Sequence, residues 1–390
     1  MNRPLVDGPV ITGLAVRNYR VLRDVTFSEL MPLTVLLGPN GSGKSTVLDV
    51  LAFLSDAVED GVGSAAARRG GLSALRSFGS SGPVEVTVEC RFAPVEHRYR
   101  YRLRLAVDDT TPVAEILEQR AAGQTDWQPL LDFAGGSGAV YGRTREVIEG
   151  DLLALDTLGR LSRFDGIKRF RQFVLGWRNV DIDVARVRAG VPAGVTGSRN
   201  SLWRAPDGAD LVRVLRDLEG TGEYDELIRD LRRLVPKLES VRVEHTAEGR
   251  LLIRLKDRTF DETAPSDAVS EGTLKLLAQL VAIRRSGASV LTVEEPENNV
   301  HPKLHYPLAE DFRRGTASGQ IIVATHSPRF VDAVRPDELW TMYRGEDGYA
   351  RVRRAADLPR VTAMLEAGGA LGDLWTEGYF GVGDPLADSR

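Results

Sequence analysis

The sequence predicts an α/β fold built on a parallel sheet, with a β-rich N-terminal lobe and a compact helical insertion. Two apolar segments, Ser289–Val293 and Ile321–Ala324, have the composition of buried strands and predict the sheet. Polar side chains follow both: an acidic pair after the first, and Thr325–Pro328 after the second. A third apolar segment, Leu33–Leu37, leads into a glycine-rich loop and then a helical pattern. Polar groups that bind ligands gather at the carboxyl ends of parallel strands, so we expect the functional residues there.

The overall composition is that of an ordinary soluble globular protein, with 42% hydrophobic and 27% charged residues among 390. This length allows two or three structural units. The net charge of -4 excludes a globally basic nucleic-acid-binding protein but leaves local basic patches open. Cys90 is the only cysteine, which excludes an internal disulfide and a cysteine-based zinc site. No apolar run resembles a signal peptide or reaches the ~20 residues of a membrane span, so we expect a cytoplasmic protein.

The glycine-rich loop has the sequence Gly38-Pro39-Asn40-Gly41-Ser42-Gly43-Lys44-Ser45-Thr46. It matches G-x-x-x-x-G-K-[ST] in full, and it lies between a predicted strand and a predicted helix, as that motif requires. Backbone N–H groups and a helix N-terminus can surround phosphate oxygens without side-chain bulk. Lys44 can reach the β- and γ-phosphates, and the Ser45 hydroxyl can hold Mg²⁺. The loop therefore predicts a nucleoside triphosphate site.

The N-terminal lobe is predicted from short strands at 11–17 and 25–27 and from a hairpin. Apolar residues alternate with polar ones in 84–92 and in 99–105, as in two strands with one buried face. The other face carries acids on the first strand and arginines on the second: Glu85, Glu89, Arg98, Arg100, Arg102 and Arg104. Cross-strand pairing explains these charges, and an arginine surface for nucleic acid or a partner is the alternative.

Residues 144–240 form the predicted helical insertion, because leucines recur there at helical spacing without the sustained heptads of a coiled coil. Its segment 160–204 holds ten basic residues against three acids, with Phe164, Phe170, Phe173, Trp177 and Trp203 among them. A solvated helix face with aromatics in the core accounts for this pattern. The alternative is a DNA-contacting surface. Its contacts would be Arg163, Lys168, Arg169 and Arg171.

We place the remaining boundaries at 1–143 for the N-terminal lobe, 241–345 for the C-terminal lobe and 346–390 for a strand and tail. Residues 361–389 contain five acids and no Lys or Arg, with leucines and aromatics among glycines. Those apolar side chains need a surface. Either they pack on the chain's own core, or they dock a separate effector protein.

Three further motifs follow in the second half of the chain. Ser270-Glu271-Gly272 opens a helical run, with Ser270 as an expected N-cap. Glu294 and Glu295 follow the buried strand Val290–Val293; we assign Glu294 to Mg²⁺ and Glu295 to the general base that polarises the attacking water. His326 follows the next buried strand, where it can donate a hydrogen bond to a γ-phosphate.

In this order the motifs resemble those of the ATP-binding cassette ATPases, in the branch that contains RecF, Rad50, the structural-maintenance-of-chromosomes proteins and the overcoming-lysogenization-defect nucleases. Gly38–Thr46 is similar to the Walker A loop, and Ser270-Glu271-Gly272 to the signature motif. Residues 290–295 resemble Walker B with its catalytic glutamate, 296–302 the D-loop, and His326 the switch histidine. The resemblance implies an ABC-ATPase-like P-loop NTPase.

The resemblance also implies the mechanism. The enzyme would bind ATP and Mg²⁺ and hydrolyse ATP as a head-to-tail homodimer, in which Ser270 and Gly272 contact the γ-phosphate on the other subunit. This nucleotide-gated pairing would control a DNA-associated activity, in antiphage defence or DNA repair, with a separate nuclease. An ATPase subunit of a membrane transporter and a non-hydrolysing ATP-dependent scaffold are the alternatives.

The sequence departs from the family pattern at several points. Glu294 stands where Walker B usually has Asp. No Q-loop glutamine can be assigned, since Gln119, Gln124, Gln128 and Gln172 are all candidates. The insertion is too short for long arms like those of Rad50, and the residues after His326 do not predict a toprim-type nuclease domain.

Overall fold

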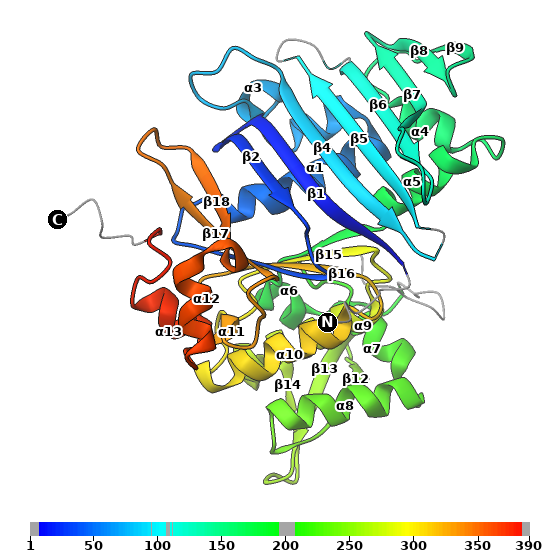
Figure 1. Cartoon of the computed structure of the whole chain (residues 1–390). Coiled ribbons are helices and arrows are strands. Elements are labelled where there is room, and N and C mark those ends of the chain that lie inside the picture. Colours follow the sequence, from blue (N-terminus) through cyan, green and yellow to red (C-terminus); the bar gives the residue numbers. More distant parts are fainter. Residues whose placement is uncertain (1–7, 95, 107–109, 111, 195–206, 384–390) are drawn as a thin grey trace.

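The computed structural model describes residues 8–94, 96–106, 110, 112–194 and 207–383. Two large sheets are stacked with helices between them, and further helices cover the opposite face of the second sheet (Figure 1). The polar edge of the second sheet carries the candidate site.

An eight-stranded antiparallel sheet forms the outer layer, in the order β2-β1-β4-β5-β6-β7-β8-β9. Its strands are β1 (Pro9–Tyr19), β2 (Leu22–Ser28), β4 (Val84–Phe92), β5 (His97–Leu105), β6 (Pro112–Arg120), β7 (Gln128–Ala134), β8 (Ser137–Val140) and β9 (Thr144–Val147). The predicted β-rich lobe and its hairpin are confirmed, with β4 and β5 paired antiparallel. Arg104 pairs with Glu85 at 2.9 Å and Arg100 with Glu118 at 2.8 Å, so neighbouring strands neutralise these arginines.

The central sheet has six strands in the order β10-β15-β16-β3-β17-β18. They are β10 (Trp177–Val180), β15 (Val290–Glu294), β16 (Gln320–Thr325), β3 (Leu33–Leu37), β17 (Leu339–Arg344) and β18 (Ala350–Arg354). The first five are parallel and β18 is antiparallel to β17. Successive residues of β16 enter different cores, with Ile322 on one face and Ile321 on the other, which is why these strands are apolar throughout.

Helices fill the space between the two sheets: α1 (Lys44–Asp60), α2 (Val62–Ala67), α3 (Leu72–Leu75), α4 (Ala154–Gly159) and α5 (Asp165–Leu175). The opposite face of the central sheet is covered by α9 (Glu271–Arg285), α10 (His305–Gly315) and α11 (Pro328–Val331). Short 3₁₀ turns lie at Ser266–Ala268, Pro302–Leu304 and Ala355–Asp357. None of the helices in the described ranges has the length and apolar composition needed to cross a membrane.

The region expected to be a helical insertion, 144–240, consists in the structure of two parts that belong to different units of the fold. Its first part belongs to the two-sheet body, because β10 is an edge strand of the central sheet and Phe170, Phe173 and Trp177 lie in the core between the sheets. Its second part supplies α6 (Val184–Ala189), α7 (Leu211–Leu218) and α8 (Gly222–Leu234), which pack with a small sheet. That sheet consists of β11 (Val191–Pro192), β12 (Leu238–His245), β13 (Arg250–Asp257) and β14 (Thr263–Pro265). Helices α4 and α5 of the two-sheet body show the same apolar spacing as helices of a separate unit, so the pattern does not locate a boundary between them.

The described part of the C-terminal tail packs on the chain's own core. It forms α12 (Pro359–Glu366) and α13 (Leu371–Thr376), and Leu371, Leu374 and Phe380 are buried there. The Gly372 N–H donates to Asp332 Oδ1 at 2.8 Å. The apolar residues are therefore used within the chain, in agreement with the first of the two sequence-based alternatives.

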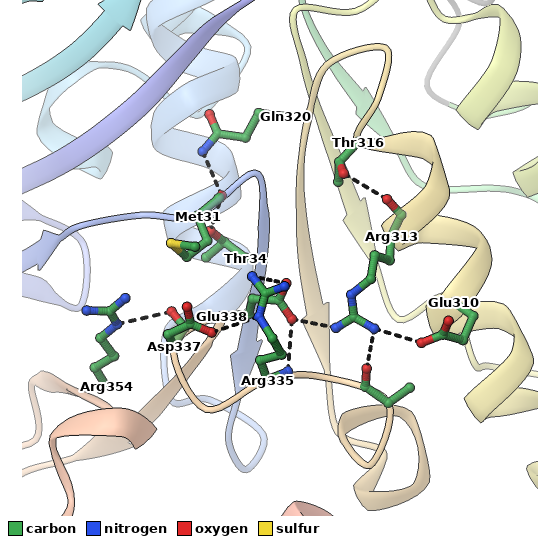
Figure 2. A network of polar contacts seen from close by, with 11 residues as sticks. Met31, Thr34, Glu310, Arg313, Thr316, Gln320, Arg335, Asp337, Glu338 and Arg354 are labelled. Atoms are coloured by element: carbon green, nitrogen blue, oxygen red, sulfur yellow. Dashed lines mark hydrogen bonds and ion pairs between the residues drawn. The ribbon is translucent and has the colours of Figure 1, made fainter. Parts of the chain in front are cut away.

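A polar network fixes the amino ends of the central strands (Figure 2). Gln320, at the start of β16, accepts from the Ile11 N–H at 2.8 Å and donates to the carbonyls of Ile11 and Met31 at 2.9 and 3.1 Å. The buried Glu338, just before β17, pairs with Arg313 at 2.5 Å and with Arg335 at 2.9 Å. These contacts all lie within the chain and tie the starts of β16 and β17 to neighbouring elements, so we interpret the network as structural.

We expect Glu115 to make stability depend on pH. Its buried carboxylate in β6 accepts from the N–H groups of Ala154 and Leu155, at 2.6 and 2.8 Å, and so caps α4. Burial raises the pKa of Glu115 to about 7 although these hydrogen bonds act in the opposite direction. Between about pH 4.5 and 7 the folded state holds a proton that the unfolded state has lost. Stability should therefore fall as pH rises through this window, by up to about 1.4 kcal/mol per pH unit.

Urea unfolding of the wild type and of Glu115→Gln from pH 5 to 8 tests this, because glutamine removes the titration. Parallel pH profiles for the two proteins would contradict the assignment.

Candidate nucleotide-binding site

The glycine-rich loop joins β3 to α1 and is shaped by backbone that only glycine tolerates well. Gly41 and Gly43 have positive φ values of 75° and 103°. A Cβ on Gly38 would lie 2.2 Å from the Met342 carbonyl oxygen of the neighbouring strand β17. The glycines thus allow the loop to curl over the carboxyl end of the sheet, and no side chain caps the N-terminus of α1.

Lys44 lies under this loop and is 5% exposed. Its Nζ donates to the carbonyls of Gly38 and Pro39 at 2.8 and 3.0 Å. Burial lowers the pKa of Lys44 to about 8, while Glu295, Glu294 and Glu297 act in the opposite direction. The neighbouring Ser42 hydroxyl is buried and has no hydrogen-bond partner. A buried cation and an unpaired buried hydroxyl beside free helix N–H groups fit a bound phosphate group.

Ser45 and Glu294 supply a candidate Mg²⁺ site. Glu294 ends β15, two strands from β3, and its Oε1 accepts a hydrogen bond from the Ser45 hydroxyl. Within the described residues no group of three or more His, Cys, Asp or Glu could form a complete metal cage. One carboxylate and one hydroxyl suit Mg²⁺, which commonly combines few protein ligands with water and substrate phosphates. Glutamate at this position reaches the same serine that the motif assigns to the metal.

Glu295, His326 and Lys44 form a line of polar contacts beside that site. Glu295 Oε1 lies 3.0 Å from His326 Nε2, and His326 Nδ1 lies 3.4 Å from Lys44 Nζ. Asn298 donates to the other carboxylate oxygen of Glu295. The structure therefore brings the predicted general base, the predicted γ-phosphate donor and the loop lysine into one cluster.

Ser270 and Gly272 lie apart from this cluster. Ser270 caps α9 by accepting from the Thr273 N–H at 3.3 Å, and both Ser270 and Glu271 are exposed. Gly272 packs against the D-loop, where a Cβ would lie 2.3 Å from the Asn299 carbonyl oxygen. Among the described contacts, no hydrogen bond joins Ser270 or Gly272 to the phosphate loop of the same chain.

None of the four glutamines that the sequence offers for the Q-loop lies at the carboxyl edge of the central sheet. Gln119 and Gln128 belong to β6 and β7, Gln124 lies in the turn between them, and Gln172 belongs to α5. Gln119 contacts His97 at 2.9 Å in the outer sheet.

Three of the four basic residues proposed for DNA form ion pairs within the chain. Arg171 pairs with the buried Asp156 at 2.8 Å, and Arg169 pairs with Asp165 at 2.8 Å. Arg163 lies 3.7 Å from Glu146 and remains 65% exposed. The pairing and the buried aromatics agree with a solvated face over a core. Arg199, Trp203 and Arg204 lie outside the described residues.

Two residues contact the site that the motifs did not single out. Arg344, at the end of β17, donates to the Gly41 carbonyl at 2.6 Å. Glu297 is buried and accepts from the His326 N–H at 2.9 Å. Their signal in the sequence is only positional, since Arg344 ends one strand of the parallel sheet and Glu297 follows another.

Similarity to known proteins agrees with this geometry. A family model described as "AAA domain, putative AbiEii toxin, Type IV TA system" matches residues 33–332. The search of curated proteins gave no match.

The solved structure of an SMC head bound to the C-terminal winged-helix domain of ScpA is 16% identical, with a TM-score of 0.54 over 88% of this chain and 97% of that one. An SMC head with an extended coiled coil, bound to the C-terminal domain of ScpA from Pyrococcus furiosus, is 15% identical with a TM-score of 0.49, covering 92% and 99%. The first match shows that the fold is that of an SMC-head P-loop NTPase.

Proposed function

Because the chain belongs to this AAA-domain family, we propose that it binds ATP together with Mg²⁺ and hydrolyses the ATP. One observation carries the proposal: the Ser45–Glu294 pair and the Glu295–His326–Lys44 cluster lie side by side at the carboxyl ends of β3, β15 and β16. A scaffold that only bound nucleotide would not need a carboxylate aligned with a histidine and the loop lysine.

The residues would divide the reaction between them. The loop N–H groups and Lys44 would bind the phosphates, and Ser45 and Glu294 would hold Mg²⁺, whose charge would offset that of the phosphate oxygens. Glu295 orients a water and accepts its proton. His326 is held by Glu297 through its backbone N–H and has its ring between Glu295 and Lys44, where it would donate a hydrogen bond to the γ-phosphate.

We further propose that two copies pair head to tail, so that Ser270 and the Gly272 N–H of one copy complete the site of the other. Two features support this: the exposed, capped start of α9, and its separation from the phosphate loop within one chain. Nucleotide would then close the pair and hydrolysis would open it. The process served would be antiphage defence or DNA repair with a separate nuclease, and Arg163 and Lys168 offer a basic surface for DNA.

Complementation between two defective variants tests hydrolysis and pairing together. Lys44→Ala should abolish ATP binding, and Ser270→Arg should block the composite site, so each variant alone should lack ATPase activity. In an equal mixture half of the pairs are mixed, and each mixed pair holds one intact site, giving about a quarter of wild-type turnover for a two-fold dimer.

No recovery in the mixture, or full activity of Ser270→Arg alone, would contradict the shared site. Wild-type protein that binds ATP without turnover would favour the scaffold.

A further inference from the structure

The loop that follows β15 has an unusual backbone. Glu295 and Asn299 have positive φ values of 42° and 64°, although neither is glycine. A left-handed conformation is unfavourable for a glutamate, and such residues persist only where their surroundings hold them. The candidate general base therefore sits on backbone that other groups must support.

Two side chains of α9 provide that support. Lys275 Nζ donates to the Glu295 carbonyl at 2.8 Å, and Gln279 Nε2 donates to the Pro296 carbonyl at 2.7 Å. The two residues are one helical turn apart, so they share a face of α9. Lys275 is 7% exposed and Gln279 is 1% exposed. The Lys275 ammonium and the Gln279 amide nitrogen are thus both directed at carbonyls of the loop that follows β15.

The same helix also contacts the far end of the loop. Gly272, in the first turn of α9, packs on the Asn299 carbonyl, and Glu271 accepts from Asn299 Nδ2 at 3.0 Å. The loop 295–299 is thus held at both ends by one helix, whose N-terminus is the signature motif.

We propose that Lys275 and Gln279 are positioning residues for Glu295, and that α9 transmits the state of the signature motif to the general base through them. The inference rests on the proposed hydrolysis. Neither residue touches the phosphate loop in the described contacts, so their role lies in the geometry of the base and not in the affinity for ATP. Displacement of α9 by nucleotide of the other subunit would shift the two carbonyls and, with them, the Glu295 carboxylate.

Lys275→Met keeps the length of the side chain and removes the donor. We expect a fall in kcat on the order of 10²-fold, the scale of a misplaced catalytic group, with the Kd for ATP within about twofold of wild type. Gln279→Leu should also lower kcat, by a smaller factor, and leave the Kd for ATP unchanged. Lys237→Met is the matched control, because Lys237 is an exposed lysine that directly precedes β12 in the small sheet.

Unchanged kcat in Lys275→Met and Gln279→Leu would overturn the inference, as would loss of ATP affinity in both variants, which would indicate a structural role. If the wild type itself does not turn over ATP, the proposed function has failed. If the wild type is active and the two variants equal it, only the positioning role has failed.

Discussion

Replacing Glu295 by glutamine should lower the turnover number for ATP by about 10²–10⁴-fold, the usual contribution of a general base. Glutamine keeps the size of the side chain and can still contact His326, 3.0 Å away, but it cannot accept the proton of the attacking water. The affinity for ATP should remain, because Lys44 and the loop N–H groups are untouched. Steady-state phosphate release and equilibrium binding of ATP, measured on the same preparations, separate the two effects.

Glu239→Gln offers a control in which an exposed glutamate undergoes the same chemical change. If Glu295→Gln keeps wild-type turnover while Lys44→Ala abolishes ATP binding, Glu295 is not the base. Slow hydrolysis should also prolong the closed pair, so Glu295→Gln with ATP should elute as a larger species than the nucleotide-free protein.

The site was predictable from sequence to the extent that its residues follow strands of one parallel sheet. The loop Gly38–Thr46, the pair Glu294 and Glu295, and His326 each follow an apolar run, and the carboxyl ends of parallel strands must meet at one edge. Their mutual contacts could therefore be expected before any coordinates. Lys275 could not be found in this way, because its role depends on the rotation of α9 against the loop.

The fold could be predicted in segments made of one type of secondary structure. It was harder to predict in segments where short strands and helices alternate. Alternation in 84–92 and 99–105 specified a hairpin, and the structure has β4 and β5 there. β10 has only four residues, and it pairs with β15, more than a hundred positions away in the sequence. Such pairing leaves no local pattern, so the sequence predicts residues 177–180 as part of the insertion.

The largest stability loss is expected at Glu338, whose carboxylate is 3% exposed and accepts from Arg313, Arg335 and the Arg335 backbone N–H (Figure 2). Glu338→Gln removes the charge but leaves both guanidinium groups in place. Breaking one side of a buried ion pair typically costs about 3–5 kcal/mol, because the remaining charge loses its counter-ion without regaining full hydration. We expect a loss near the lower end of that range, since Arg313 and Arg335 are 27% and 36% exposed and water can reach them.

The adjacent Asp337 supplies a matched comparison on the same arginine. Its side chain is 38% exposed and contacts Arg335 at 3.1 Å, and exposed pairs of this kind contribute about 0–1 kcal/mol. Urea unfolding should therefore show a small change for Asp337→Asn and a large one for Glu338→Gln. Equal losses of stability in the two variants would mean that burial of the carboxylate does not determine its contribution.

The same pair of variants should differ in ATP affinity. Arg344, at the carboxyl end of β17, contacts the phosphate loop, so loosening the amino end of β17 in Glu338→Gln should weaken ATP binding, whereas Asp337→Asn should not.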